Sequence, residues 1–306
     1  MEISIIVPIY NTAKTLLKCL TSISQQTFPD FEVILIDDGS KDNSGIICDK
    51  FISNDSRFKV IHKKNEGVAI ARQTGILHAK GKYTIHIDSD DWVEPTMLEN
   101  MYKEAIRTNS DIIITDYFIE KNSKQKLIKQ KPSSLTANSI LIDILEGKIF
   151  GALWNKLIKT ELYNKYNIQF FKNINYCEDV LICAQILRHS DIKISYLNEA
   201  FYHYVINLQS ITHSYSRENY NMRLAFNYKL REILPIKEYE KEIQISNLTT
   251  FAEGFMYNIL TKEEIRKEFK KNEYAAFHFN NSLRWKIGYF LIKVRIYSLA
   301  RHFIKY

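Results

Sequence analysis

The first 120 residues of the chain alternate short runs of β-branched residues with stretches of helical periodicity. The strand-like runs lie at residues 3–8, 32–36, 59–62, 82–87 and 111–117. After the first run, Leu16, Leu20 and Ile23 recur at helical spacing, and Pro95 suits the first turn of a later helix. Successive strand–helix–strand units place parallel strands in one sheet with helices on both faces. This alternation therefore predicts an α/β, Rossmann-like fold with a mostly parallel sheet.

A lysine-rich stretch and a later change of pattern divide the rest of the chain. Residues 121–134 hold five lysines and few core-forming residues, which indicates a solvated hairpin or a mobile arm. The section that follows should contain a helix over 136–146, a helix after Glu178 and strands over 192–197 and 201–206. Beyond Ser216 the patterns are helical. We therefore expect an α/β domain over 1–215 and a C-terminal helical extension over 216–306.

Composition limits the location and the class of partner. Four cysteines (Cys19, Cys48, Cys177 and Cys183) stand apart without metal-type spacing, which favours reduced thiols in a cytosol. The chain opens directly into a strand-like run with no signal sequence before it, so we expect a cytoplasmic protein. The net charge of +7 favours an anionic partner. Since the excess charge is terminal rather than spread over a groove, we do not expect nucleic acid.

The last segment combines positive charge with apolar periodicity. No acidic residue follows Glu273, and six basic residues crowd the end: Arg284, Lys286, Lys293, Arg295, Arg301 and Lys305. One helical stripe holds Trp285, Tyr289, Ile292, Ile296, Leu299 and Phe303. Such a helix either packs on the preceding domain or lies on an anionic membrane, and Lys293 and Arg295 make it a poor spanning helix. We expect residues 284–306 to contact an anionic membrane surface, which places the protein peripherally at the inner face of the cell membrane.

Polar residues follow three of the predicted strands where each strand ends. These clusters are Pro8-Ile9-Tyr10-Asn11, Asp37-Asp38-Gly39-Ser40 and Asp88-Ser89-Asp90-Asp91. In an open, mostly parallel sheet, ligands bind beyond the carboxyl ends of the strands. We therefore expect the three clusters to meet at one edge. Asp and Ser also cap helices and form turns, which is the alternative explanation for Asp37 and Asp91 above all.

The chemistry of the third cluster predicts a metal ion. The first turn has no glycine, and no GxxxxGK[ST] sequence occurs, so neither a dinucleotide fingerprint nor a P-loop holds phosphates here. Asp88 and Asp90 would repel a diphosphate unless a cation lay between them. A hard divalent ion such as Mn²⁺ or Mg²⁺, bound by oxygen ligands, is the natural mediator. It would also neutralise the charge that grows on a departing nucleotide.

Seven segments, in order over residues 3–215, resemble the family 2 glycosyltransferases of the GT-A fold, the class that builds bacterial surface polysaccharides. They are VPIYN (7–11), QTFPDFEVILIDDGS (26–40), NEGVAIARQTGI (65–76), GKYTIHIDSDD (81–91), WNK (154–156), ED (178–179) and FYHY (201–204). The resemblance implies an enzyme that moves a sugar from a nucleotide-diphosphate donor, a UDP-sugar by the family's uracil-type contact, to an acceptor hydroxyl with inversion. The acceptor would be a saccharide or a lipid-linked saccharide.

The resemblance also implies a donor site. Pro8, Tyr10 and Asn11 would surround the base and ribose. Asp38 would accept a hydrogen bond from the base imide, and Arg72 would help to hold the nucleotide. Gln73 stands where the family often has Asn, and it keeps the amide.

A metal site and a catalytic pair complete the expected machinery. The DxD-type motif implies Asp88 and Asp90 as metal ligands, with Asp90 the direct one and Ser89 beside the donor. His203 would supply a further metal or diphosphate contact, although a strand position would also explain it.

The pair Glu178 and Asp179 matches the family's acidic pair, whose aspartate is the general base. Acids also favour the first turn of a helix without any catalytic purpose. The segment 154–156 fits either a packed Trp with exposed neighbours or acceptor positioning.

Two other functions are compatible with parts of this pattern. A nucleotidyltransferase also joins a nucleotide-binding sheet to carboxylates and a divalent ion, but it usually carries a Gly-rich basic loop that residues 10–14 do not resemble. A non-catalytic nucleotide-sugar-binding protein would tolerate loss of the acidic pair, and this chain retains it.

Overall fold

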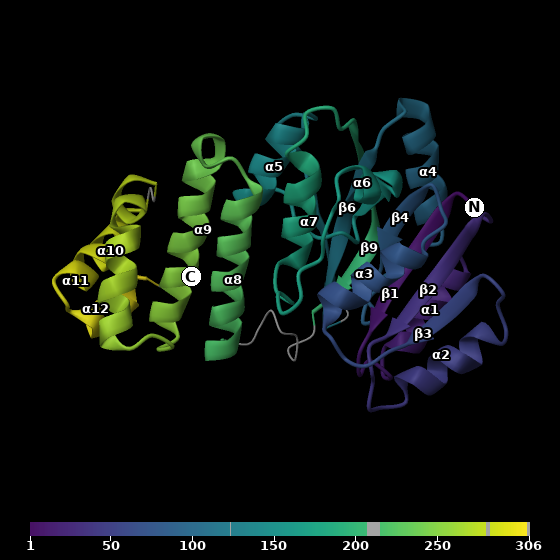
Figure 1. Ribbon diagram of the computed structural model, residues 1–306, viewed down its shortest axis with the longest axis horizontal. Helices are drawn as coiled ribbons and strands as arrows, with labels where there is room; N and C mark the ends of the chain where they lie inside the picture. The colour runs from purple at the N-terminus through teal and green to yellow at the C-terminus, as the bar shows by residue number, and fades with distance from the viewer. Residues whose placement is uncertain (123, 207–214, 280–281, 305–306) are drawn as a thin grey trace. The chain divides into compact units, whose positions relative to one another are not determined.

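The computed structural model describes residues 1–122, 124–206, 215–279 and 282–304. The chain forms two compact units, Met1–Asn207 and Leu208–Tyr306 (Figure 1). Within the described residues, nine strands form a single sheet in the first unit, and the second unit is helical. The domain limits 1–215 and 216–306 stay a prediction.

Four parallel strands form the first part of the sheet. They are β1 (Ile3–Ile9), β2 (Phe31–Asp37), β3 (Phe58–His62) and β4 (Tyr83–His86), in the order β3-β2-β1-β4. Every residue of β1 and β2 is buried, as expected for parallel strands with both faces covered. The predicted strands in this part are confirmed to within one or two residues at each end.

The second part of the sheet mixes parallel and antiparallel pairs. The order continues through β8 (Lys156–Lys159), β6 (Ile112–Lys121), β9 (Ile194–Val205) and β5 (Trp92–Val93). β7 (Lys124–Ile128) pairs with β6 as a hairpin, one of the two alternatives for this stretch, in which residue 123 lies outside the described residues. The two strands predicted over 192–206 are one strand, β9, whose register against β6 shifts at Asp116. The sheet is therefore parallel in its first four strands and mixed beyond them.

Helices cover both faces of the sheet. On one face, α1 (Leu16–Ser24), α2 (Ser44–Ile52) and α4 (Met97–Thr108) pack against the odd-numbered side chains of β1. On the other lies α3 (Val68–His78), whose Gly75 sits directly over Ile6, with α5 (Ala137–Leu145) and α7 (Glu178–Leu187) farther along. A short helix, α6 (Glu161–Lys165), follows β8. The helices predicted over 136–146 and after Glu178 are confirmed.

The second unit contains α8 (Arg217–Ile233), α9 (Ile236–Met256), α10 (Lys262–His278), α11 (Leu283–Lys293) and α12 (Tyr297–Phe303). Ser216 and Thr261 cap α8 and α10 with their side chains, as these residue types commonly do. Phe251, Phe255 and Phe269 form the centre of its core.

The single helix predicted for the tail is wrong. The chain leaves helical geometry between α11 and α12, where Arg295 has a φ of 69°. Tyr289 and Ile292, expected on a membrane-facing stripe, are buried in the core of the unit. Lys305 lies outside the described residues. None of the helices in the described ranges is long and apolar enough to cross a membrane.

The close contact between α3 and β1 gives a test of the fold. A Cβ atom on Gly75 would lie 2.3 Å from Cγ2 of Ile6 in the central strand. Gly75→Ala should therefore lower the free energy of unfolding by about 1–3 kcal/mol through overpacking, reduced by up to about 1 kcal/mol of helix propensity. Urea denaturation measures the change. The control is Leu77→Ala, which truncates an exposed side chain on the same helix and should be nearly neutral.

Candidate active site

The three polar clusters meet at one edge of the sheet. The backbone N–H of Asn11, after β1, donates to Oγ of Ser40, after β2, at 3.1 Å. Oδ1 of Asn11 accepts from the backbone of Lys41 at 2.7 Å. Thr12 Oγ1 donates to Oγ of Ser89, after β4, at 3.0 Å. The carboxyl ends of β1, β2 and β4 are thus held together by hydrogen bonds, as the parallel arrangement predicts.

The residues expected around the base and ribose differ in their exposure. Pro8 is buried within β1, opposite Ile36 of β2. Tyr10 is exposed directly after the strand, so its ring is accessible to a ligand. Asn11 has a φ of 53°, in the left-handed region that Asn tolerates better than most residues.

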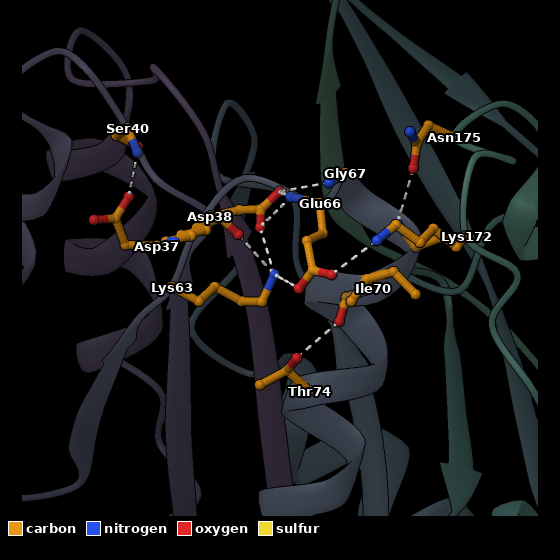
Figure 2. A network of polar contacts seen from close by, with 12 residues as sticks. Asp37, Asp38, Ser40, Lys63, Glu66, Gly67, Ile70, Thr74, Lys172 and Asn175 are labelled. Carbon is orange, nitrogen blue, oxygen red and sulfur yellow. Dashed lines mark hydrogen bonds and ion pairs between the residues drawn. The ribbon is translucent and has the colours of Figure 1, made fainter.

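The Asp38 carboxylate is the centre of a polar network (Figure 2). It is only 2% exposed and accepts hydrogen bonds from Lys63 Nζ at 2.8 Å, the Glu66 N–H at 3.0 Å and the Gly67 N–H at 2.8 Å. The Glu66 carboxylate in turn pairs with Lys63 at 2.9 Å and with Lys172 at 3.2 Å. A base imide would meet Asp38 together with Lys63, a partner that the sequence did not single out.

Asp37 has a different environment from its neighbour. Its Oδ1 accepts from the backbone N–H of Ser40 at 3.0 Å, and its Oδ2 contacts Nδ1 of His62 at 2.8 Å. The contact with Ser40, three residues on, is of the turn-forming kind. This is the structural alternative given for Asp37.

A buried arginine links the donor side of the site to the acidic pair. Arg72, in α3, is fully buried, and its Nη2 donates to Oδ1 of Asp88 at 2.8 Å. Its Nε lies 3.5 Å from Oε1 of Glu178 and 3.4 Å from Oδ1 of Asp179. One guanidinium therefore faces three carboxylates. Since burial disfavours charge unless it is paired, these four groups depend on one another.

The acidic pair occupies the first turn of α7. Burial raises the pKa of Glu178 to about 8, and the negative charge of Asp179 adds to the effect. Burial also raises the pKa of Asp179, against the opposing charge of Arg72. Oδ2 of Asp179 accepts from the backbone N–H of Leu153 at 3.1 Å, while its Oδ1 has no hydrogen-bond partner among the described residues. A carboxylate with a raised pKa, held by one hydrogen bond and one ion pair with Arg72, is suited to accept a proton.

The segment 154–156 is buried, and Lys156 in it holds the loop that contacts Asp179. The Lys156 ammonium donates to the carbonyl oxygens of Phe150 and Ala152, each at 2.7 Å. These bonds shape the loop that presents the Leu153 N–H to Asp179. Trp154 stacks on Tyr202 with ring centroids 4.2 Å apart. Trp154 is therefore packed, as one alternative expected, but its neighbours Asn155 and Lys156 are buried rather than exposed. Burial lowers the pKa of Lys156.

Two carboxylates of the loop after β4 remain accessible. Asp88 and Asp90 are partly exposed, whereas Asp91 is buried and accepts from the Tyr202 hydroxyl at 2.6 Å and the Val205 N–H at 2.7 Å. The same hydroxyl accepts from the backbone N–H of Asp88 at 3.1 Å. Asp91 and Tyr202 thus fix the loop, while Asp88 and Asp90 stay partly exposed. Two carboxylates fit an ion such as Mg²⁺, which completes its coordination with phosphates and water.

His203 does not join these carboxylates. Its buried ring stacks between Trp92, 3.5 Å away, and Phe118, 4.7 Å away, and its Nε2 contacts Oε1 of Glu94 at 2.9 Å. Among the residues that the structure describes, no group of three His, Cys, Asp or Glu side chains is placed to hold a metal. The predicted metal site of Asp88, Asp90 and His203 is therefore not assembled. His203 lies in β9 opposite Trp92 of β5, and its ring packs between aromatic side chains.

Known proteins resemble this chain in sequence and in fold. Residues 4–180 match the family model described as Glycosyl transferase family 2. The chain is 32% identical over 254 residues to the putative glycosyltransferase EpsH of Bacillus subtilis, covering 79% of this chain and 72% of that protein. It is 36% identical over 214 residues to the cholesterol galactosyltransferase of Borreliella burgdorferi, covering 66% of this chain and 59% of that protein.

Among solved structures, S. aureus TarS 1–349 in complex with UDP-GlcNAc has a similar fold. The TM-score is 0.74 at 20% identity, over 99% of this chain and 90% of that one. The likeness confirms the predicted fold class, a GT-A α/β domain followed by C-terminal helices.

The buried arginine gives a test of the site's construction. Arg72→Met should lower the free energy of unfolding by about 3–5 kcal/mol at pH 8, because it leaves buried carboxylates uncompensated. The loss should shrink as the pH falls below the raised pKa of about 8 of Glu178, since a protonated carboxyl needs no counter-charge. Urea denaturation at pH 5 and pH 8 measures both effects. The control is Lys103→Met, which breaks an exposed pair with Glu99 and should leave stability nearly unchanged at either pH.

Proposed function

Because the chain belongs to glycosyl transferase family 2, we propose that it is an inverting, metal-dependent hexosyltransferase that moves a sugar from a UDP-sugar to an acceptor hydroxyl. The observation that supports this most directly is the placement of Asp179. Its carboxylate is held by the Leu153 N–H and faces Arg72, which reaches Asp88 on the donor side. The Arg72 guanidinium therefore contacts both the proposed proton acceptor, Asp179, and Asp88 at the edge proposed to bind the diphosphate.

In this proposal Asp179 is the general base. An acceptor alcohol becomes a good nucleophile only as its proton is removed, and a positioned carboxylate accelerates such a step by about 10²–10⁴-fold. The Leu153 N–H orients Oδ2, which leaves Oδ1 to take the proton. Direct attack by the acceptor on the anomeric carbon, opposite the leaving nucleotide, inverts the configuration. Glu178 lies beside the base, and its protonation state tunes the base: the neutral form that its raised pKa favours adds no negative charge next to Asp179.

Asp88 and Asp90 would hold the divalent ion. When bound, Mn²⁺ or Mg²⁺ supplies Lewis-acid neutralisation of charge on the leaving diphosphate. Asp88 must serve this site while paired with Arg72, which orients its carboxylate. The bonds from Tyr202 to Asp91 and Asp88 keep the loop in place.

UDP is the proposed nucleotide because the TarS structure contains UDP-GlcNAc in a similar fold. Asp38 would accept the imide N–H of uracil, and Tyr10 and Asn11 would lie against the base and ribose. Arg72 and Ser89 complete the donor side. The name of the Borreliella burgdorferi relative, a galactosyltransferase, supports a hexose as the transferred group.

The acceptor is proposed to be a saccharide or a lipid-linked saccharide in the assembly of a surface polysaccharide, capsule or glycolipid. The same relative acts on cholesterol by name, so a lipid acceptor has precedent in the family. The enzyme would work in the cytoplasm at the inner face of the cell membrane, where it would be peripherally bound.

A donor screen tests the proposed function. The purified chain is incubated with UDP-GlcNAc, UDP-galactose, UDP-glucose and their GDP counterparts, and release of nucleoside diphosphate is measured with Mn²⁺, Mg²⁺ or EDTA. Metal-dependent release of UDP from one UDP-sugar supports the proposal. Tight donor binding without release under any condition, including added lipid-linked and free saccharides, would indicate a binding protein instead.

The base assignment predicts a separation of transfer from binding. Asp179→Asn keeps a group that can accept from the Leu153 N–H but cannot take a proton, so the transfer rate should fall about 10²–10⁴-fold. UDP affinity, measured by calorimetry, should stay near the wild-type value. Glu178→Gln is the control, and it should retain more transfer than Asp179→Asn. The opposite ranking of the two variants would move the base to Glu178.

The raised pKa of Asp179 also predicts the pH dependence of transfer. The base acts only when it is ionised, so at saturating substrate the rate should fall as the pH drops through this pKa. The acid limb should therefore lie above the ordinary aspartate value of about 3.9. A rate that stays constant down to pH 4 would argue against a buried carboxylate base.

The metal assignment predicts a complementary pattern. Asp90→Asn should abolish the dependence of UDP binding on Mn²⁺, because the neutral amide is a weaker ligand for a hard cation. Calorimetric titration of UDP with and without Mn²⁺ measures this, and circular dichroism checks the fold. Full wild-type activity in EDTA would remove the metal from the mechanism.

A further inference from the structure

The outer face of α11 presents an apolar stripe to solvent. Leu283, Ile287, Phe290 and Val294 are 73%, 39%, 56% and 46% exposed. Their spacing of four, three and four residues places them along one line of a helix with 3.6 residues per turn. We call these four residues the α11 stripe. A row of large exposed apolar side chains is typical of a surface that contacts a membrane or another protein.

The α11 stripe lies opposite the face that packs into the protein. Gly288, Tyr289 and Ile292 are buried, and a Cβ atom on Gly288 would lie 2.5 Å from Ile304. The helix is therefore packed into the protein through this inner face, and the α11 stripe makes no contribution to the core. The stripe is also distinct from the one that the sequence pattern suggested, which contained Tyr289 and Ile292.

Positive charge lies on both sides of the α11 stripe. By helical position, Arg284 flanks it on one side, and Lys286 and Lys293 flank it on the other. Lys293 pairs with Glu273 at 2.7 Å, the last acidic residue of the sequence. The surface therefore combines exposed apolar groups with basic residues whose only acidic counterpart in this segment is Glu273.

We propose that the α11 stripe docks on an anionic lipid bilayer, with Arg284 and Lys286 at the level of the headgroups. Helices that lie in a membrane interface have this pattern, in which an apolar row enters the acyl boundary and flanking basic side chains meet anionic headgroups. Long basic side chains reach outward from such an apolar row. A protein partner would require acidic complementarity on both sides of the row, whereas an anionic bilayer supplies it everywhere. The inference extends the proposed peripheral location by naming the contacting surface.

Vesicle sedimentation of the full chain tests this surface. Wild-type protein should pellet with vesicles of phosphatidylcholine and phosphatidylglycerol, and much less with phosphatidylcholine alone. Ile287→Ser combined with Phe290→Ser should weaken this binding by at least about tenfold, because both side chains leave the apolar row. Arg284→Gln combined with Lys286→Gln should weaken it as well, and high salt should remove most of the remaining difference between the two lipids.

The control carries two equally drastic changes elsewhere. Leu77→Ser with Ile106→Ser replaces two exposed apolar side chains of the first unit and should leave vesicle binding unchanged. Thermal unfolding confirms that each variant is folded. Wild-type protein that does not pellet, or a stripe variant that pellets like the wild type, overturns the proposal. A stripe variant that instead loses self-association in light scattering also overturns it, in favour of a second copy of the chain.

The release of UDP is measured on the same preparations without vesicles. The stripe variants should release UDP at the wild-type rate, since the α11 stripe contains no residue of the proposed site. Vesicle binding without any UDP release would reject the proposed enzymatic function but support the proposed membrane-binding surface. UDP release without vesicle binding would support the enzymatic function and reject the membrane-binding surface.

Discussion

One buried guanidinium, that of Arg72, sets the geometry of the candidate active site. It donates to Asp88 after β4, and its Nε lies within 3.5 Å of Glu178 Oε1 and Asp179 Oδ1 at the start of α7. An unpaired charge in a low-dielectric interior is costly, so each group is stable there only while the others keep their places. The contact thereby joins α3 and the loop after β4 to α7, which lies about a hundred residues later in the sequence. It also fixes the proposed base relative to the proposed metal-binding edge.

A second layer of buried polar contacts holds this first one in place. The Lys156 ammonium shapes the loop whose Leu153 N–H orients Asp179, and the Tyr202 hydroxyl joins Asp91 to the Asp88 backbone. Both anchors lie in the mixed half of the sheet, where β8 and β9 continue the parallel half. The parallel strands therefore bring the three polar clusters to one edge, and the mixed strands supply the support for the acidic pair. Neither half contains the complete candidate site.

The sequence predicts what is periodic and local better than what depends on tertiary contacts. The first four strands follow from runs of β-branched and apolar residues that alternate with helical patterns. β5 has only two residues, which carry no periodicity, and β8 has two lysines in its four residues, so neither stands out as a strand-like run. In the tail, α11 has an apolar row on each of two faces, and sequence alone cannot say which one the core covers. His203 is compatible with a ligand or with a strand residue, and only its pairing in β9 with Trp92 decides the matter. The contact of Arg72 with the acidic pair joins segments about a hundred residues apart, which no local pattern reveals.

The charges of the site do not balance within the protein, and this imbalance bears on its chemistry. One arginine faces three carboxylates, and Asp90 adds a fourth to the same edge. Protonation relieves part of the repulsion, as the pKa of about 8 of Glu178 indicates. The rest leaves a net negative edge that would repel a diphosphate on its own. A divalent cation on Asp88 and Asp90 would reverse that repulsion and leave Asp179 ionised beside Arg72. The proposed divalent ion is thus consistent with both an anionic donor and the excess of carboxylates over Arg72 at this edge.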